Sequence, residues 1–519
     1  MTGPALPASL SADRLAALVA GITGTGERST AAAPFTGLPI VDLPTSTAAD
    51  LDAAAARARI AQRSWAARPV AGRAGWLLRL HALVLDRQRE LLDVIQAETG
   101  KARGHAFEEV MDVAINCRFY GRSAPKLLAP KRRSGAVPGL TRTVEVRHPL
   151  GLVGLISPWN YPLALGMSDA LPALVAGNAV LHKPDTQTAL TALTGRALAI
   201  EAGLPADLWQ IVLGAGNVVG PAVIDRVDHI GFTGSTATGR TVATRAAGRL
   251  IGAGLELGGK NAMIVCPDAS VGAAAAGAVR GSFSSTGQLC VSIERIYVHR
   301  SIADDFTRRL VDGTRALRLG AGYDDRFQIG SLTSQAQLDR VAGHVQDAVA
   351  AGAKVLVGGE ARPELGPYFF EPTVLADVPP TAKCYRGETF GPVVAVYPVD
   401  SDEEAIRLAN DATVGLNASV WSADAGRARG IAERLHAGMV NINEMYTAAW
   451  GSVAAPIGGW GDSGLGRRHG AEGLIVNTWV QTIARQRLRA IGEAAPLTGA
   501  RYRKAMTASL RAMKAGGRR

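Results

Sequence analysis

Apolar residues recur every three to four positions along much of the first 130 residues. The pattern is clearest over 51–63, 73–94 and 106–120. This spacing places the apolar side chains on one face of a helix, so it predicts amphipathic helices there. We expect residues 11–135 to form a largely helical part at the start of the chain.

From residue 151 the pattern changes to short apolar runs with helical stretches between them. The runs predict strands over 151–156, 179–181, 210–213 and 228–232, and the longer stretches predict helices over 188–202 and 236–249. Strands that alternate with helices form parallel, doubly wound sheets, and dinucleotides bind at the carboxyl ends of such strands. Residues 151–259 are therefore expected to form a Rossmann-type cofactor domain.

A second α/β unit is expected over 260–445. Its predicted strands are 262–265, 295–298, 355–357, 393–399 and 418–421, and a helical segment is predicted over 271–280. The following residues, 446–475, are rich in glycine and are expected to be a loop that returns to the cofactor domain.

Two segments alternate polar and apolar residues without an obvious partner nearby, at 141–148 and 479–484. Exposed strand edges need covering. Residues 136–150 and 476–490 are therefore expected to form a two-part oligomerisation arm, with a homodimer as the minimum assembly and a homotetramer as an open alternative. Residues 491–519 are expected to be a basic tail.

Charge and cysteine usage narrow the function. The chain has 519 residues and a formal charge of +11, but seven Lys and Arg and no acidic residue lie in 501–519. Because no nucleic-acid module is recognisable, we expect a solvated tail and no nucleic-acid partner. The tail could instead hold a membrane surface, with Leu510 and Met513 as its apolar side.

The four cysteines, at positions 117, 266, 290 and 384, are scattered. This spacing predicts neither a metal site nor a disulfide framework, so a reducing cytoplasmic location is expected. The first ten residues lack a secretory signal pattern. The longest apolar run, 170–181, is too short and too interrupted for a transmembrane helix.

One cysteine has a setting that suits chemistry. Gly287-Gln-Leu-Cys290 follows a run of small residues, which permits close approach of a ligand. A thiol there is a candidate nucleophile if a neighbouring group helps to form the thiolate. A candidate base, Glu256, lies 34 residues upstream in Glu256-Leu-Gly-Gly-Lys260, before the predicted strand 262–265. Taken singly, such a Cys is more often a buried hydrophobe and such a Glu a loop residue.

Glu-Leu-Gly-Gly-Lys followed by Gly-Gln-Leu-Cys resembles the signature of the aldehyde dehydrogenase superfamily. The resemblance implies that Cys290 attacks an aldehyde, that hydride transfer leaves a thioester, and that Glu256 activates the water that hydrolyses it. Asn160, in Ser157-Pro-Trp-Asn-Tyr-Pro162, matches the family residue whose amide, with the Cys290 N–H, binds the oxyanion. Glu256 needs a raised pKa for this role.

The same resemblance assigns a nicotinamide cofactor. A glycine turn follows a predicted strand at 214–220, Ser235 opens a predicted helix that can hold a phosphate, Lys183 can bond a ribose or a phosphate, and Glu388 and Phe390 match residues at the nicotinamide side. The expected cofactor-binding residues are Ser157, Pro158, Trp159, Lys183, Asp185, Thr186, Gly216, Gly220, Phe232, Gly234, Ser235, Thr238, Leu257, Glu388 and Phe390.

Thr186 bears on the choice between NADP and NAD. Relatives that prefer NAD commonly have a Glu at this position, and its charge would repel a 2′-phosphate by roughly 4 kcal/mol at about 4 Å and a dielectric of about 20. Thr186 removes that charge and adds a hydroxyl. We therefore expect NADP as the preferred cofactor, with NAD possible, unless Asp185 points inward and restores the repulsion.

Within the superfamily the chain is similar to actinobacterial NADP-dependent succinate-semialdehyde dehydrogenases. Members with that activity bind the substrate carboxylate through arginines at two positions, which are Ser168 and Ser284 here. The two hydroxyls, or an arginine such as Arg295 or Arg467, could take over that role.

A more apolar aldehyde is the alternative substrate, with Leu165, Met167, Tyr446 and Trp450 near the entrance. Leu165, Ser168, Ser284 and Trp450 are the expected substrate residues. A CoA-acylating dehydrogenase is a further alternative, disfavoured by Glu256 because those relatives generally lack the base. A non-catalytic scaffold is disfavoured because nucleophile, base and oxyanion group are all present.

Two positions depart from the family pattern. The Gly458-Gly-Trp-Gly461 loop lacks the usual lysine, and Arg468 replaces a common acidic residue. The sequence offers no physical explanation of either.

Overall fold

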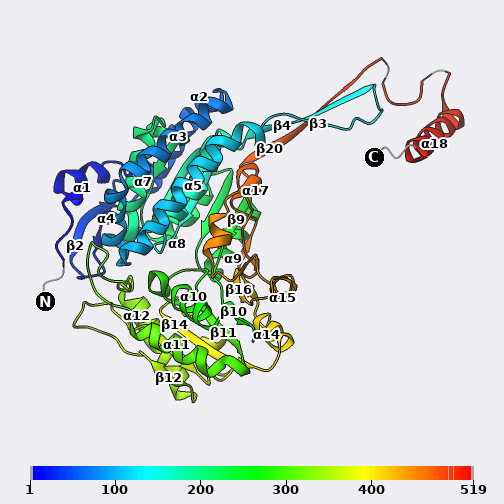
Figure 1. The fold of residues 1–519 in the computed structure, drawn as a ribbon. Helices are drawn as coiled ribbons and strands as arrows, with labels where there is room; N and C mark the ends of the chain where they lie inside the picture. Colours follow the sequence, from blue (N-terminus) through cyan, green and yellow to red (C-terminus); the bar gives the residue numbers. More distant parts are fainter. Residues whose placement is uncertain (1–3, 489, 495, 516–519) are drawn as a thin grey trace. The chain divides into compact units, whose positions relative to one another are not determined.

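The computed structural model describes residues 4–488, 490–494 and 496–515 (Figure 1). Contacts between Cα atoms divide the chain into two compact units. The larger unit comprises Met1–Leu127 and Pro149–Thr478, and the smaller comprises Leu128–His148 and Trp479–Arg519. The smaller unit contains both segments predicted as an arm.

The N-terminal part of the larger unit is mainly helical. Its helices are α1 (Ala12–Val19), α2 (Ala48–Ala66), α3 (Val70–Asp86), α4 (Gln88–Thr99) and α5 (Arg103–Leu127). The single helix predicted over 73–94 is wrong, because the chain leaves the helical conformation at Arg87 (φ −97°, ψ 17°) and α4 begins after it. No Gly or Pro marks this break in the sequence.

The part expected to be largely helical, 11–135, also contains strands that the sequence did not predict. Strands β1 (Arg28–Ala32) and β2 (Pro39–Pro44) pair antiparallel. Only Ala31 and Leu43 are buried in the two strands. Because so few positions are buried, the two strands lack the alternation of apolar and polar residues from which a strand is predicted.

The first large sheet contains the expected parallel strands. Its order is β19-β9-β8-β5-β6-β7, formed by β5 (Leu152–Ser157), β6 (Ala179–Pro184), β7 (Trp209–Ile211), β8 (His229–Thr233), β9 (Gly252–Glu256) and β19 (Gly464–Leu465). The four predicted strands are confirmed, and β9 was missed. Its helices are α6 (Pro162–Ala176), α7 (Ala189–Glu201), α8 (Gly216–Ile224) and α9 (Thr236–Gly248).

The second large sheet has the order β12-β13-β14-β11-β10-β16-β17. Its strands are β10 (Asn261–Val265), β11 (Ile293–His299), β12 (Lys354–Val357), β13 (Thr373–Ala376), β14 (Val393–Val399), β16 (Asn417–Trp421) and β17 (Met439–Ile442). All pairings are parallel except that of β12 with β13. Buried residues of β10, β11 and α10 (Val271–Phe283) share one core, which supports the segment that carries Cys290.

Shorter elements complete this unit. The helices are α11 (Ala303–Arg315), α12 (Gln335–Ala350), α13 (Lys383–Arg386), α14 (Asp402–Ala409), α15 (Ala425–Ala432), α16 (Thr447–Gly451) and α17 (Gly470–Ile475), and the strands are β15 (Val414–Gly415) and β18 (Trp460–Gly461). The expected loop over 446–475 is therefore not wholly irregular. Its strand β19 pairs antiparallel with β9 and joins the first sheet.

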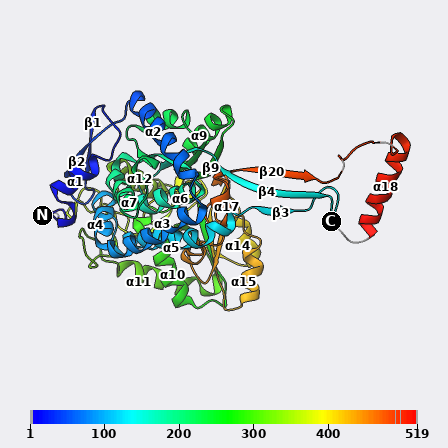
Figure 2. The same ribbon diagram turned by 90° about the horizontal axis from the view of Figure 1, so that it is seen from above.

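The smaller unit contains a three-stranded sheet in the order β20-β4-β3 (Figure 2). The strands are β3 (Lys131–Arg133), β4 (Thr141–Pro149) and β20 (Thr478–Gln486). The two predicted arm strands are confirmed, and they are neighbours in one chain. Helix α18 (Gly499–Ala515) lies within the segment expected as a tail. In the described part of the chain, no helix combines the length and apolarity needed to cross a membrane.

Candidate active site

Cys290 lies in a tightly packed loop between α10 and β11. Ser285 (φ 52°) and Thr286 (φ 56°) adopt the left-handed conformation, which is rare for residues other than glycine. Gly287 (φ 69°) follows, and a Cβ atom there would lie 2.0 Å from the carbonyl oxygen of Gly391. Only glycine fits at this position, so the loop presents Cys290 in one defined place.

The thiol of Cys290 lies between two cavities. A cavity of about 230 Å³ and another of about 370 Å³ are both lined by Cys290 and Leu165. The first is also lined by seven residues expected at a cofactor, Pro158, Trp159, Gly234, Ser235, Leu257, Glu388 and Phe390. The second is mainly apolar and is lined by Trp450 and Tyr446 among others. Cys290 can therefore meet molecules that enter from either cavity.

The Cys290 thiol is held in its protonated form. Burial raises its pKa to about 12, and the negative charges of Glu256 and Glu388 act in the same direction. A nucleophilic role therefore needs a group that accepts the thiol proton as the sulfur attacks. The other three cysteines are free and buried.

Asn160 lines the smaller cavity together with Cys290. Its Nδ2 donates to the backbone carbonyl oxygen of Gln288 at 2.9 Å, and its backbone carbonyl oxygen accepts from Nζ of Lys101 at 2.5 Å. These bonds fix the amide beside the Cys290 loop. An Asn amide has two N–H donors, so the bond to Gln288 leaves one for a ligand.

Glu256 lies before β10, as expected, but at the end of a strand that the sequence did not predict. It is the last residue of β9, opposite Gly464 of β19. Strand β9 was missed because its sequence, Gly-Ala-Gly-Leu-Glu, offers little alternation. The parallel sheet nevertheless forms it, because β8 pairs along its whole length.

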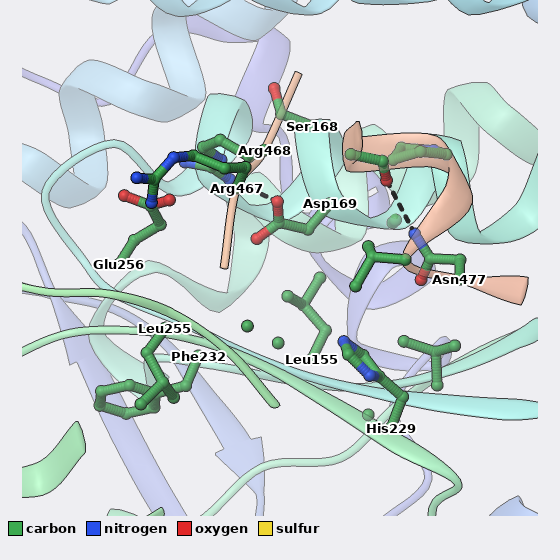
Figure 3. A pocket seen from close by; sticks show the side chains of 18 of the residues that line it. Leu155, Ser168, Asp169, His229, Phe232, Leu255, Glu256, Arg467, Arg468 and Asn477 are labelled. Carbon is green, nitrogen blue, oxygen red and sulfur yellow. Dashed lines mark hydrogen bonds and ion pairs between the residues drawn. The ribbon is translucent and has the colours of Figure 1, made fainter. Parts of the chain in front are cut away.

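The carboxylate of Glu256 lines a third cavity of about 50 Å³ rather than either cavity at Cys290. In Figure 3 it points towards the side chains of Arg467 and Arg468. Burial raises its pKa to about 7, the positive charge of Arg468 counteracts this, and the negative charge of Asp169 adds to it. Among the described residues no side-chain hydrogen bond to this carboxylate forms, and its charge is still felt at Cys290.

Arg468 now has a structural role. It is buried, and its guanidinium pairs with Asp169 at 2.6 Å (Figure 3). Burial lowers its pKa, but the carboxylates of Asp169 and Glu256 outweigh that effect and leave the pKa above its ordinary value. A permanent positive charge therefore lies close to the candidate base.

Glu388 and Phe390 form part of the wall of the cavity of about 230 Å³. Oε1 of Glu388 accepts from the N–H of Gly259 at 2.9 Å, and burial followed by the charge of Glu294 raises the pKa of Glu388 to about 7. Phe390 (φ 56°) meets Trp159 edge to face, with ring centroids 5.6 Å apart.

A larger cleft of about 980 Å³ lies beside α8 and α9. Gly216, Gly220, Phe232 and Thr238 line it. The hydroxyl of Ser235 caps α9 by accepting from the N–H of Thr238 at 3.3 Å. Four further residues expected at a cofactor thus line this cleft, and Ser235 connects it in sequence to the smaller cavity.

The remaining expected cofactor residues form internal bonds. The Ser157 hydroxyl lies 2.7 Å from Nε2 of His182, and Nζ of Lys183 donates to the carbonyl of Pro184 at 3.2 Å. The Asp185 carboxylate accepts from the N–H of Gln187, so it caps its own turn. Thr186 follows in that turn, half-buried.

The expected substrate residues divide into two groups. Leu165 and Trp450 line the larger cavity, but Ser168 and Ser284 do not. The Ser168 hydroxyl donates to Asp112 at 2.5 Å, and the Ser284 hydroxyl donates to the carbonyl of Arg280 at 2.7 Å. Both serines are buried in internal bonds, which a sequence pattern cannot show.

Neither arginine suggested as a substitute lines the larger cavity. The Arg295 guanidinium donates to the carbonyls of Lys260 and Ala409, so it is bound internally and does not reach this cavity. Arg467 lines the cavity of Glu256 instead and donates to the Gly466 carbonyl at 2.6 Å. Met167, expected near the entrance, is buried away from it.

Sequence reasoning missed one supporting residue of the site. Glu294 pairs with Lys260, and its carboxylate accepts from the backbone N–H groups of Thr389 and Phe390. It therefore fixes the segment that carries Glu388. Within the described residues, no group of three His, Cys, Asp or Glu is arranged to hold a metal ion.

Comparison with known proteins identifies the class. A sequence profile of the Aldehyde dehydrogenase family matches residues 22–483. The chain therefore belongs to the aldehyde dehydrogenase family, whose members are oxidoreductases that act on aldehydes.

Two relatives of the chain carry names that specify a substrate and a cofactor. A Mycolicibacterium smegmatis protein named "Putative succinate-semialdehyde dehydrogenase (NADP+)" is 52% identical over 480 residues, covering 92% of this chain and 93% of the relative. A similarly named Mycobacterium tuberculosis protein is 52% identical over 454 residues, covering 88% of each.

Solved structures show the same fold. An Escherichia coli NADP dependent enzyme has a TM-score of 0.85 at 32% identity, covering 89% of this chain and 95% of its own. Betaine aldehyde dehydrogenase from Staphylococcus aureus, in complex with NAD+, has a TM-score of 0.84 at 31% identity, covering 88% and 91%. The expected aldehyde dehydrogenase-like α/β fold is confirmed.

Proposed function

We propose that this chain oxidises an aldehyde to a carboxylic acid with a nicotinamide cofactor, and that Cys290 is the nucleophile. The observation that carries the proposal is the position of Cys290 between two cavities. One is lined by polar and aromatic groups suited to a cofactor, and the other by apolar groups suited to the substrate tail. The hydride would pass from the aldehyde carbon bound to Cys290 to the nicotinamide. The substrate and the cofactor must therefore both reach this thiol.

The residues of the chain can carry out each step. The Cys290 sulfur adds to the aldehyde carbon as the thiol proton passes to a water molecule, and the carbonyl oxygen gains charge. The free N–H of Asn160 and the N–H of Cys290 would donate to that oxygen. A bound nicotinamide supplies the hydride acceptor. The thioester that remains on Cys290 is attacked by water. Glu256 would take a proton from this water once its side chain has turned from its own cavity towards Cys290. The acid then leaves and the thiol is restored.

The binding surface fits a dinucleotide. Gly216 leaves open space in the cleft, since a Cβ atom there would meet no atom within 4 Å. At Gly258 a Cβ atom would instead lie 2.5 Å from the Glu388 carboxylate. We assign Glu388 to the ribose beside the nicotinamide, Phe390 and Trp159 to the wall of that site, and the α9 N-terminus with Ser235 to the pyrophosphate.

NADP is the proposed cofactor, with NAD as the alternative. Thr186 brings no negative charge to the adenosine ribose, and Asp185 is turned into its own cap rather than left free. The relatives named above are called NADP-dependent, which supports the same choice.

Residues 151–259 with 446–475 are assigned to cofactor binding and 260–445 to catalysis.

Succinate semialdehyde is the first candidate substrate, because both of these relatives carry that name. An apolar aldehyde is a second candidate, favoured by the lining of the larger cavity. Release of the thioester to CoA is disfavoured because a carboxylate with a pKa of about 7 is available to activate water. Full activity without added CoA would agree with hydrolysis.

Assembly through the arm is also proposed. Trp479, Val480 and Ile483 of β20 are at least half exposed, and an exposed apolar edge strand invites pairing with another chain. A homodimer is the minimum and a homotetramer the alternative, which analytical ultracentrifugation would distinguish. The free cysteines suit a reducing cytoplasmic location.

Production of NADPH from NADP and succinate semialdehyde, butanal or hexanal tests the function, followed by absorbance without CoA. We expect turnover by the native chain and none by Cys290→Ala. Cys384→Ala, which removes a thiol away from both cavities, should retain activity. Equal turnover by Cys290→Ala and the native chain would refute the proposal.

A further inference from the structure

The larger cavity at Cys290 has a mainly apolar wall that also contains two carboxylates and the polar groups of His81, Tyr161, Tyr446 and Thr447. It has a volume of about 370 Å³, and its apolar lining includes Leu85, Met111, Ile115, Leu165, Leu289 and Val291. Met111 is 41% exposed and Leu85 47% exposed. The cavity therefore leads from solvent to the thiol between apolar side chains.

Both carboxylates come from α5. Glu108 and Asp112 are four residues apart, so they lie on the same face of the helix. The Glu108 oxygens accept from the hydroxyls of Tyr161 at 2.8 Å and Tyr446 at 3.0 Å. Burial raises the pKa of Glu108 above its ordinary value, and the two tyrosine bonds counteract that effect in part.

The second carboxylate is bound in the same way. Asp112 accepts from the Ser168 hydroxyl at 2.5 Å, from Nε1 of Trp450 at 2.8 Å and from Nδ2 of Asn116 at 3.2 Å. All of these donors are neutral groups of the protein. Neutral donors hold both carboxylates in place without supplying a positive charge to balance them.

No Lys or Arg of the described cavity wall is available for an anionic tail, and Nδ1 of His81, the imidazole in the wall, lies 2.8 Å from the carbonyl oxygen of Ala114. None of the described residues that line the cavity is Lys or Arg. Three cations lie close enough to act on the two carboxylates, and each already pairs elsewhere: Lys101 with Glu109, Arg280 with Glu444 and Arg468 with Asp169. A carboxylate that enters this cavity would lose water without gaining a counter-ion, which is costly.

We infer that the larger cavity takes the uncharged, apolar tail of an aldehyde, and that Glu108 and Asp112 select against a tail ending in a carboxylate. The inference rests on the proposed function, because it assumes that the reacting aldehyde reaches Cys290 through this cavity. It reverses the order of the two candidate substrates given above: the cavity favours an aliphatic or aromatic aldehyde over succinate semialdehyde, which the names of the relatives support.

Two four-carbon aldehydes provide the sharpest test. Butanal and succinate semialdehyde differ only in a terminal methyl group against a carboxylate. With NADP and the native chain, we expect kcat/KM for butanal to exceed that for succinate semialdehyde by at least about tenfold. Hexanal should be better still, by roughly two- to fourfold for each added methylene, because each buries more apolar surface.

Glu108→Gln tests the selecting residue. The amide keeps an acceptor for one tyrosine and removes the charge, so kcat/KM for succinate semialdehyde should rise about fivefold or more relative to butanal. Glu201→Gln, on the exposed end of α7, is the matched control and should leave the ratio unchanged. If the variant does not fold, the comparison of substrates with the native chain still decides the matter.

Two results would overturn the inference. One is succinate semialdehyde equalling or exceeding butanal in kcat/KM. The other is 4-trimethylammoniobutanal exceeding butanal, since the cavity would then select a cation. Either result leaves the proposed oxidation intact. Failure of every aldehyde to reduce the cofactor would instead refute the proposed function.

Discussion

Replacing Glu256 by glutamine should stop the reaction after hydride transfer. The amide has nearly the same size but cannot accept a proton from water. We expect a burst of about one NADPH per active site, followed by steady turnover lowered by about 10²–10⁴-fold, the range typical for loss of a general base. The burst should remain because Glu256 acts on the thioester, which forms only after the hydride has left.

The pH dependence follows from the environment of Glu256. Burial raises its pKa to about 7, and only the carboxylate form can accept a proton. Below this pKa the base is protonated and hydrolysis slows; above it the rate reaches a plateau. For a pKa of about 7 the basic fraction is roughly a tenth at pH 6 and nine tenths at pH 8, so hydrolysis should rise about tenfold between them.

Rapid mixing with absorbance detection separates the burst from the steady rate at each pH. Glu433 is exposed and directly follows α15. Glu433→Gln is therefore a suitable control and should behave like the native chain. A steady rate unchanged in Glu256→Gln would refute the assignment of the base. A native rate of hydrolysis that does not vary between pH 6 and 8 would refute the argument from burial.

Three further predictions concern single residues. Arg468→Gln removes a positive charge that stabilises the Glu256 carboxylate, so the hydrolysis profile should move to higher pH, while Arg468→Lys should move it less. Leaving Asp169 unpaired should also lower the free energy of unfolding by about 3–5 kcal/mol, which denaturant titration measures. Thr186→Glu should lower kcat/KM with NADP by roughly 10–100-fold and leave NAD nearly unaffected, in steady-state kinetics with both cofactors. Gly287→Ala should lower both activity and melting temperature, because a Cβ atom has no space there; an unchanged melting temperature would contradict the packing argument.

The sequence predicted elements that have a clear contrast of apolar and polar residues, and it missed elements such as β9 and α6 that have none. Runs such as 393–399 are apolar and bounded by turns, and β14 has the predicted bounds. Helix α6, which follows Asn160, was not predicted because it is apolar on every side and contains Pro172. Its burial on all faces removes the periodicity by which a surface helix is found.

The motifs around Asn160 and Cys290 can be recognised in the sequence. The residues from distant parts of the chain that contact the site cannot. Asn160 and Cys290 line one cavity, as expected from the family resemblance. The pair Arg468 and Asp169 joins residues 299 positions apart, so no local pattern links them. Ser168 was expected at the substrate because of its position in the sequence alone, whereas its hydroxyl is bound by Asp112.

Mass spectrometry of the acylated protein tests directly whether Cys290 carries the thioester. Glu256→Gln is mixed with NADP and hexanal, quenched in acid and digested. We predict that the peptide containing Cys290 gains the mass of the aldehyde less two hydrogens, as a thioester requires, while peptides containing Cys117, Cys266 and Cys384 are unchanged. Accumulated NADPH with no added mass on Cys290, or the added mass on another cysteine, would contradict it.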